Sequence, residues 1–219
     1  MAVSYIIGEG EKRTMKTPVI KRTGKYQAHG SFGSYFVLNA KKKIGVKVLN
    51  DRYRVKDLEN NFKSFLDKDI MNGFFYKNNP LTDAAKEIVA IQMLALSGKT
   101  PKPIGLCWVD RGKYFEIGIV MEHIAGKTLY EHCQNNDKVD NWNYDKMEMK
   151  YRGKWIKDFG IDVQDWHNKN IMVDRKGKQY RIDFSPGYFD LETDRKDEYY
   201  QRVMYEVLSL VENFPGVVI

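Results

Sequence analysis

The sequence contains only two cysteines and no long apolar run. Cys107 and Cys133 lie far apart and form no C-x-x-C motif, which excludes a disulfide-rich scaffold and a cysteine-based zinc site and predicts a reduced, intracellular protein. The most apolar stretch, residues 88–96, is too short to span a bilayer, and the opening residues lack the apolar core of a secretory signal. We therefore expect a cytoplasmic protein that does not associate with membranes.

Charge of one sign does not dominate the chain. Its 219 residues include 36 Lys and Arg and 29 Asp and Glu, and the tightest basic run is Lys41, Lys42 and Lys43. Because acids and bases are interleaved, the net charge of +7 indicates a solvated surface that helps to attract polyanions such as nucleotides, and we expect no specific nucleic-acid binding. The length and the apolar content of 42% predict one large domain or two small lobes with a proper core.

Residues 161–187, IDVQDWHNKNIMVDRKGKQYRIDFSPG, concentrate acidic and amide side chains around a predicted hairpin. A turn at Gly177 separates two short strands. This hairpin would bring Asp165, Asn170 and Asp183 to one rim, where their oxygen atoms would suit hard metal ions and a phosphate chain. The alternative is an ordinary polar hairpin, because Asp and Asn also cap and turn the backbone.

Residues 25–49 read as three strands joined by a glycine turn and a charged turn. Glycines at positions 30 and 33 would let backbone N–H groups approach a phosphate closely, although a plain hairpin turn explains the same residues. Lys47 lies within the apolar strand GVKVL and points to the face opposite its neighbours. This lysine therefore either reaches the surface or needs an anion.

A helix is predicted from Thr82 or Asp83 to Gly98, over the sequence DAAKEIVAIQMLALSG. Glu87 lies on its apolar side, where a carboxylate without a partner is costly. Lys47 is in the corresponding position in its strand, because a buried ammonium without an anion is also costly. We expect the two charges to pair, and the alternative is that each reaches solvent independently.

The remaining pattern predicts a second region that begins near residue 123. Residues 101–122 read as two strands around a turn, and a glycine-containing linker follows Met121, Glu122 and His123, which marks a lobe boundary. Residues 50–80 read as a charged and aromatic insertion with some helix. Apolar and polar patterning predicts three further helices, at 127–134, 144–159 and 195–214.

Taken in order, these pieces resemble the protein-kinase-like superfamily over about residues 25–187. Residues 30–33, GSFG, resemble its phosphate-covering loop, with Ala28 where the family usually has its first glycine. Residues 165–170, DWHNKN, are similar to its catalytic loop, and residues 183–185, DFS, to its metal-binding motif. The order of these motifs carries the resemblance, because no single one is specific.

The resemblance implies an α+β, bilobal protein-kinase-like fold. Residues 1–122 would form an N-lobe with an antiparallel sheet and one key helix, and residues 123–219 a reduced, mainly helical C-lobe. It also implies ATP and Mg²⁺ as cofactors.

The roles of the family's residues carry over to the matching positions. Asp165 would orient and deprotonate the attacking hydroxyl, and Asn170 and Asp183 would hold one or two Mg²⁺ ions. Lys47, braced by Glu87, would hold the α- and β-phosphates. The other residues expected to contact the nucleotide are Gly30, Ser31, Phe32, Gly33, Met121, Glu122 and His123.

The chain departs from protein kinases at several positions. Val163 and Gln164 replace the usual His-Arg, and His167 replaces a Lys, which gives the D-x-H-x-x-N form of aminoglycoside and choline kinases. His167 would either touch the γ-phosphate or pack the loop. Ser185 replaces the Gly after Asp-Phe, no A-P-E motif is present, and few residues follow Gly187. The platform that protein kinases use for peptide substrates is therefore missing or rebuilt.

Three functions fit this pattern. The first is a minimal serine/threonine-type protein kinase, the second a small-molecule kinase of the aminoglycoside or choline type, and the third a nucleotide-binding pseudokinase that acts as an interaction module. Retention of the lysine, the glutamate and the three polar residues of the hairpin argues against the third. The expected partner is thus a protein or small-molecule hydroxyl acceptor. Compact kinases of this kind also occur in viruses and phages. If this chain were encoded by one of them, the cytoplasm in which we expect it would be that of the host.

Overall fold

The structure is a computed structural model that describes the following residues: 4–6, 12–14, 19–21, 28–29, 33–49, 80–134, 144–163, 166–184, 189–191 and 196–212. Strands β1 (Ser4–Ile6) and β2 (Lys12–Thr14) form a small antiparallel pair near the N-terminus. The predicted insertion at residues 50–80 lies outside the described residues except for Pro80.

Among the described residues, the largest sheet has six strands, in the order β3-β7-β8-β6-β5-β4. Its neighbouring strands pair antiparallel except β3 and β7, which run parallel. The strands are β3 (Val19–Lys21), β4 (Ala28–His29), β5 (Gly33–Asn39), β6 (Ile44–Leu49), β7 (Pro103–Asp110) and β8 (Phe115–Glu122). The predicted strands of residues 101–122 are thereby confirmed.

Both faces of the sheet bury apolar side chains. Because side chains alternate along a strand, Trp108 on β7 joins the large core under the helices, whereas its neighbours Cys107 and Val109 join a smaller cluster on the opposite face. Val46 and Val48 on β6 belong to that smaller cluster as well. The charged residue between them, Lys47, consequently projects toward the helical side.

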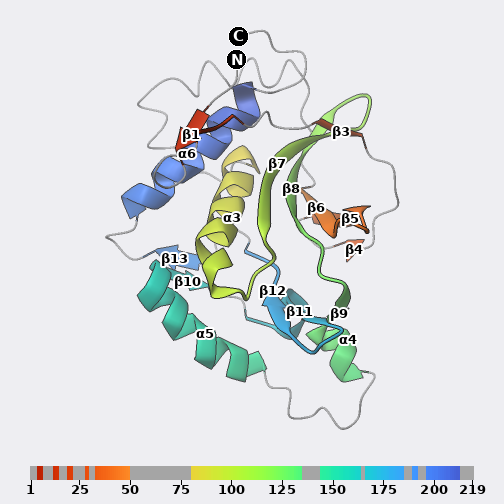
Figure 1. The fold of residues 1–219 in the computed structure, drawn as a ribbon, viewed down its shortest axis with the longest axis vertical. Coiled ribbons are helices and arrows are strands. Elements are labelled where there is room, and N and C mark those ends of the chain that lie inside the picture. The colour runs from red at the N-terminus through yellow and green to blue at the C-terminus, as the bar shows by residue number, and fades with distance from the viewer. Residues whose placement is uncertain are drawn as a thin grey trace.

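Helix α3 (Pro80–Leu94) lies against the sheet and contacts β7 and β8 (Figure 1). It is followed by a 3-10 turn, Ala95–Ser97, and by Gly98, which has a φ of 65°. Glycine adopts this left-handed conformation without the steric cost of a Cβ, which explains why the helix ends where the sequence predicts.

A second group of elements follows residue 122. Strand β9 (Gly126–Thr128) pairs with β11 (Ile171–Asp174), which pairs with β12 (Gln179–Arg181), so the predicted hairpin is confirmed. Gly177, with a φ of 77°, lies in its turn. The other elements here are α4 (Leu129–Gln134), α5 (Tyr144–Phe159), β10 (Ile161–Val163) and β13 (Phe189–Leu191), the last two of which pair antiparallel.

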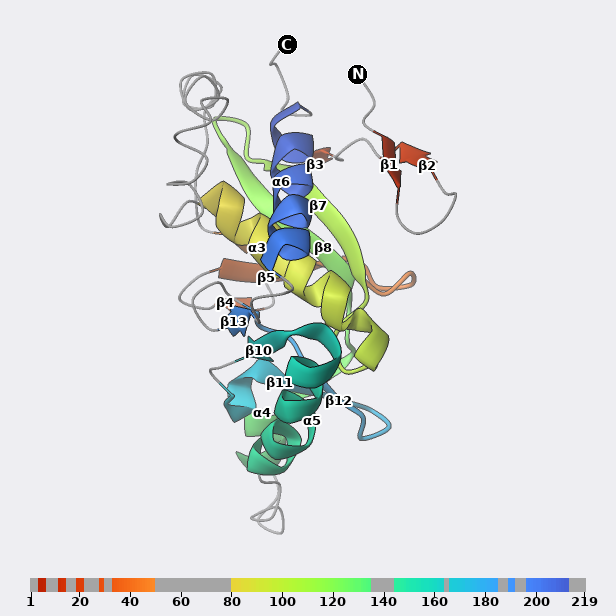
Figure 2. The ribbon, with the colours of Figure 1, turned by 90° about the vertical axis from the view of Figure 1, so that its left-hand side faces the viewer.

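The terminal helix α6 (Lys196–Glu212) returns to the first group of elements. It contacts α3 and β7, and both views show it crossing close to α3 (Figures 1 and 2). The indole Nε1 of Trp108 on β7 donates to the carbonyl oxygen of Leu210 at 2.9 Å. The division into lobes at residue 122, which assigns this helix to the C-lobe, stays a prediction.

The architecture is a mixture of helices with a curled, largely antiparallel sheet. It is compatible with the bilobal fold that the resemblance implies, and that finer assignment stays a prediction. Within the described ranges, none of the helices has both the length and the apolar character needed to cross a membrane.

Candidate functional site

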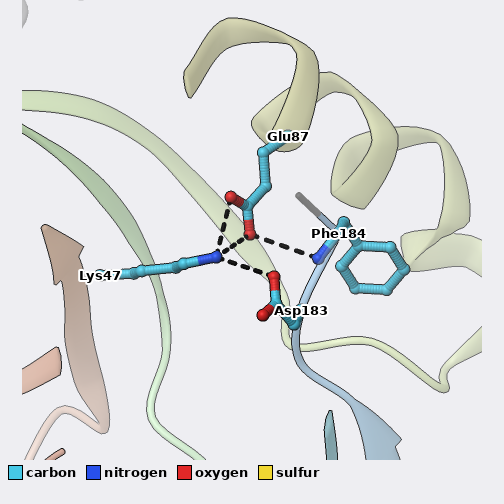
Figure 3. A network of polar contacts seen from close by, with 4 residues as sticks. All are labelled: Lys47, Glu87, Asp183 and Phe184. Atoms are coloured by element: carbon cyan, nitrogen blue, oxygen red, sulfur yellow. Dashed lines mark hydrogen bonds and ion pairs between the residues drawn. The ribbon is translucent and has the colours of Figure 1, made fainter. Parts of the chain in front are cut away.

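Lys47 and Glu87 form a buried ion pair between the sheet and α3. Lys47 Nζ lies 2.7 Å from Oε1 and 2.9 Å from Oε2 of Glu87 (Figure 3). The glutamate side chain is 1% exposed and the lysine side chain 14% exposed. The structure thus joins the two charges that the sequence places inside apolar segments, each of which offsets the cost of burying the other.

Asp183 completes the cluster from the hairpin side. Lys47 Nζ donates to Oδ1 of Asp183 at 2.9 Å, and the Phe184 backbone N–H donates to Oε1 of Glu87 at 3.4 Å (Figure 3). The Asp183 side chain is 32% exposed, so the cluster extends from the closed interior at Glu87 toward solvent. Elements that are distant in sequence therefore meet at one ammonium group.

Burial and charge act in opposite directions on these groups. Burial alone would lower the pKa of Lys47, but the carboxylates of Glu87 and Asp183 outweigh it and raise that pKa, so the ammonium stays charged. Burial raises the pKa of Glu87, against the opposing effect of the Lys47 ammonium. With both carboxylates ionised, the three groups carry one net negative charge, which favours a cation beside the exposed side of Asp183.

Asn170 lies opposite the segment that carries Asp183. It ends a short 3-10 turn, Asn168–Asn170, and the backbone N–H of Ile182 donates to its carbonyl oxygen at 3.0 Å. The hairpin register therefore sets Asn170 beside the residue that precedes Asp183, and Asn170 is 8% exposed. The hairpin thus brings the backbone of Asn170 close to the segment that carries Asp183, and the predicted rim of side-chain oxygens stays a prediction.

His167 caps the turn that leads to Asn170. Its Nδ1 accepts a hydrogen bond from the backbone N–H of Lys169 at 3.2 Å, which requires the neutral ring to carry its proton on Nε2. Of the two roles expected for His167, this contact supports packing of the loop. Its catalytic role stays a prediction.

Three aromatic side chains pack together next to the loop that carries His167 and Asn170. Trp166 is 7% exposed, and its indole N–H donates to the carbonyl oxygen of Val163 at 2.6 Å. The ring of Trp155 on α5 lies 5.3 Å from that of Trp166 and 6.2 Å from that of Phe184, centroid to centroid. These packed rings fix the two ends of the hairpin, because a buried side chain in a close-packed core has little freedom to shift.

The predicted nucleotide-contacting residues at the end of β8 are engaged with neighbouring backbone. The N–H of Glu122 donates to the carbonyl oxygen of Lys102 at 2.8 Å, and the N–H of His123 donates to that of Lys43 at 2.7 Å. Met121 is buried, at 4% exposure. Contact between a base and Glu122 or His123 would therefore use carbonyl oxygens or side chains, and the binding role of these residues stays a prediction.

Tyr35 on β5 is a further candidate site residue, because it contacts the predicted nucleotide-contacting residue His123, and the sequence pattern did not indicate it. Its hydroxyl lies 2.9 Å from Nδ1 of His123, and the two rings stack with centroids 6.0 Å apart. Tyr35 pairs with Lys47 in the strand register, and its phenol covers the Cα of Gly45, which has no side chain in the way. Burial raises the pKa of Tyr35, so the phenol stays neutral. The glycine two residues before Lys47 is the signal that could have indicated this contact.

Four predicted site residues, Asp165, Gly30, Ser31 and Phe32, lie outside the described residues. Gly33, the last residue of the predicted glycine turn, begins β5. Their functional roles stay predictions.

The polar residues at the hairpin rim fit a magnesium ion only in part. Among the described residues, no three His, Cys, Asp or Glu side chains form a group that could hold a metal. Mg²⁺ in nucleotide sites often takes one or two carboxylates, while phosphates and waters supply its other ligands. The carboxylate of Asp183 and the amide of Asn170 fit that limited set of protein ligands.

Comparison with known proteins gives a distant similarity to a kinase. No protein-family profile matches the chain. The chain is 30% identical over 91 residues to proteins named 3-deoxy-D-manno-octulosonic acid kinase from the M23, Temecula1 and 9a5c strains of Xylella fastidiosa. The match covers 40% of this chain and 34% of each relative, so the chain matches about a third of their length. The similarity supports a kinase-type relationship and phosphotransfer in general.

Proposed function

We propose that the chain is an ATP- and Mg²⁺-dependent phosphotransferase that transfers the γ-phosphate of ATP to a hydroxyl group. One observation carries the proposal: the ammonium of Lys47 is held between the carboxylates of Glu87 and Asp183. Phosphoryl transfer requires a protein mainly to position groups and to offset charge. A fixed ammonium beside a carboxylate that is partly open to solvent supplies both requirements.

The proposed mechanism assigns each residue one task. Lys47 binds the α- and β-phosphates, and Glu87 keeps the ammonium in place because its own side chain is closed off from solvent. Asp183 and Asn170 hold Mg²⁺, which when bound offsets the charge of the phosphates. Asp165 accepts the proton of the attacking hydroxyl.

A small hydroxylated acid is the acceptor that we place first. The relatives are named for phosphorylation of 3-deoxy-D-manno-octulosonic acid, a sugar acid, and residues 165–170 have the D-x-H-x-x-N form of small-molecule kinases. The net charge of +7 also favours an anionic substrate over a cationic one. These observations reverse the order that the sequence alone favours, in which a protein acceptor comes first.

A protein hydroxyl is the second candidate. The order of a glycine turn, a strand lysine and a helix glutamate supports it, because protein kinases share that order. The third candidate is a module that binds a nucleotide but transfers no phosphate. The experiment described next includes this candidate as one of its outcomes.

The acceptor is tested by incubating the purified chain with γ-labelled ATP and Mg²⁺ together with either 3-deoxy-D-manno-octulosonic acid or a generic protein mixture. Wild type is compared with Asp165→Ala. Label on the sugar acid that is lost in the variant supports the first candidate, and label on protein supports the second. Stabilisation by ATP without transfer to any acceptor supports the binding module. If the wild type shows no transfer to any acceptor and no stabilisation by ATP, the proposal is contradicted.

A further inference from the structure

Helix α3, which carries Glu87, is buried on almost every side. Seven of its apolar residues have 0% exposure: Ala84, Ala85, Ile88, Val89, Ala90, Ile91 and Leu94. A helix that buries apolar side chains on more than one face must be covered on each of those faces. The sheet covers one face through β7 and β8, and α6 covers another (Figure 2).

Helix α6 supplies a matching apolar stripe. Four of its residues are at most 1% exposed and follow one face of the helix: Tyr199, Val203, Val207 and Leu210. They belong to the same buried core as the apolar residues of α3. The two helices therefore form one packed unit, although they come from distant parts of the chain.

Three directional hydrogen bonds fix α6 at both ends. The hydroxyl of Tyr199 donates to the carbonyl oxygen of Lys86 at 2.9 Å, directly before Glu87 in the sequence. The amide of Gln92 donates to Oε1 of Glu206 at 2.8 Å, and Trp108 on β7 donates to the carbonyl oxygen of Leu210. Apolar packing alone permits sliding along a helix, whereas these bonds define one position.

We propose that α6 is a built-in brace that sets the position of Glu87 and that Tyr199 is its main positioning residue. The inference rests on the proposed function and deepens it: contacts within the chain itself hold Glu87 in position for its pair with Lys47. Because α3 is a rigid hydrogen-bonded helix, movement at Lys86 moves Glu87 with it. The brace thus acts on the site through Glu87 and touches no substrate.

The surroundings of Tyr199 agree with this role. The residue is 1% exposed, and burial raises its pKa well above the ordinary value, with smaller contributions from Tyr200, Glu87 and Asp83. The hydroxyl therefore remains a neutral donor throughout the physiological range. Tyr205 on the same helix is 55% exposed and provides a matched control for the same Tyr→Phe change.

The test compares Tyr199→Phe with Tyr205→Phe at a temperature where both variants and wild type are fully folded. The first readout is the rate at which an acylating reagent modifies Lys47, measured by mass spectrometry against the exposed Lys154. We expect Tyr199→Phe to raise the Lys47 rate about fivefold, in the direction of Glu87→Gln, and Tyr205→Phe to leave it unchanged. Equal rates in the two Tyr→Phe variants would overturn the brace.

The second readout is phosphotransfer, which separates the brace from the proposed function. Tyr199→Phe should lower kcat/KM about fivefold, and this loss should disappear in the Glu87→Gln background, because two residues that act through one contact are not additive. A loss of the same size in both backgrounds would show that Tyr199 does not act through Glu87. Absence of transfer in wild type contradicts the proposed function, whereas the acylation readout still decides about the brace.

Discussion

Lys47 and Glu87 are 40 positions apart in the sequence, yet Nζ of the lysine lies within 2.9 Å of both carboxylate oxygens of the glutamate. The contact joins a strand of the central sheet to the helix that covers it. Asp183 reaches the same ammonium from the hairpin, 136 positions away from Lys47. The stability of this cluster and the proposed chemistry therefore depend on the same few atoms, and substitutions can separate the two.

Lys47→Met should destabilise the fold as well as abolish phosphotransfer. The substitution leaves the Glu87 carboxylate, which is 1% exposed, without its main charge partner. Removing one member of a buried pair costs about 3 kcal/mol of unfolding free energy. Urea denaturation measures this loss.

Lys47→Met/Glu87→Leu is the matched variant. Replacing both charges with apolar groups of similar size removes the uncompensated carboxylate, so most of the lost stability should return while activity does not. A double variant as unstable as Lys47→Met would show that the pair does not account for the cost.

Asp183→Asn should separate metal dependence from stability. The Asp183 side chain is 32% exposed and its ion pair with Lys47 is partly solvated, so the loss of unfolding free energy should be below about 1 kcal/mol. Phosphotransfer should fall about 100-fold, because the carboxylate proposed to hold Mg²⁺ is gone. Mg²⁺ titration of the transfer rate measures the effect. Asp162→Asn is the control, because Asp162 on β10 forms an ion pair with Arg152 of α5 rather than with Lys47. Comparable losses of phosphotransfer in both variants would contradict the assignment of Asp183.

Glu206→Gln should stabilise the chain at neutral pH. Burial on α6 raises the pKa of Glu206 above its ordinary value of 4.5, although the hydrogen bond from Gln92 opposes the shift. The stability that this carboxyl contributes is therefore fully present below pH 4.5 and is lost as the pH rises through the folded-state pKa. Gln at this position stays neutral and can still accept the bond from Gln92.

The gain from Glu206→Gln should accordingly be larger at pH 8 than at pH 5, as measured by the urea midpoint. Glu198→Gln, at an exposed position of the same helix, provides the control. A gain that does not depend on pH would contradict this interpretation.

Gly45→Ala should destabilise the sheet by displacing Tyr35. A Cβ at position 45 would overlap the hydroxyl end of that phenol, which lies 2.9 Å from His123. Overpacking of this kind costs about 2 kcal/mol of unfolding free energy. Tyr35→Ala should lower the cost of Gly45→Ala by removing the overlapping atoms, which thermal unfolding of the single and double variants tests.

Gly153→Ala on α5 is the control for the glycine substitution. A Cβ there meets nothing within 4 Å, so the change should stabilise the helix by up to about 1 kcal/mol. Equal effects at positions 45 and 153 would show that contact with Tyr35 is not the cause.

The sequence predicted the structure correctly where a residue has only one conformation or partner of low free energy. A lysine inside an apolar strand and a glutamate on an apolar helix face each need an opposite charge, which predicted the pair of Lys47 and Glu87. The turn at Gly177 predicted the hairpin because glycine adopts positive φ readily. Helix α5 has the predicted bounds, Tyr144–Phe159.

The missed contacts depend on long-range geometry that local patterns do not contain. The apolar stripe of α6 indicates burial, but nothing in its spacing shows that α3 is the partner. Tyr35 and His123 are 88 positions apart, and their contact follows from strand order and from the space above Gly45. The hydrogen bond from Tyr199 to the backbone at Lys86 involves a carbonyl group, which every residue has, so side-chain identity gives no signal for it.

The central claim is that the cluster of Lys47, Glu87 and Asp183 turns over ATP. Its most direct measurement is the Mg²⁺-dependent release or transfer of label from γ-labelled ATP by wild type and by Lys47→Met/Glu87→Leu, after urea denaturation has shown that both are folded and similarly stable. We predict turnover by wild type and at least about 100-fold less by the double variant. Equal turnover by the two proteins, or none by wild type, would contradict the claim.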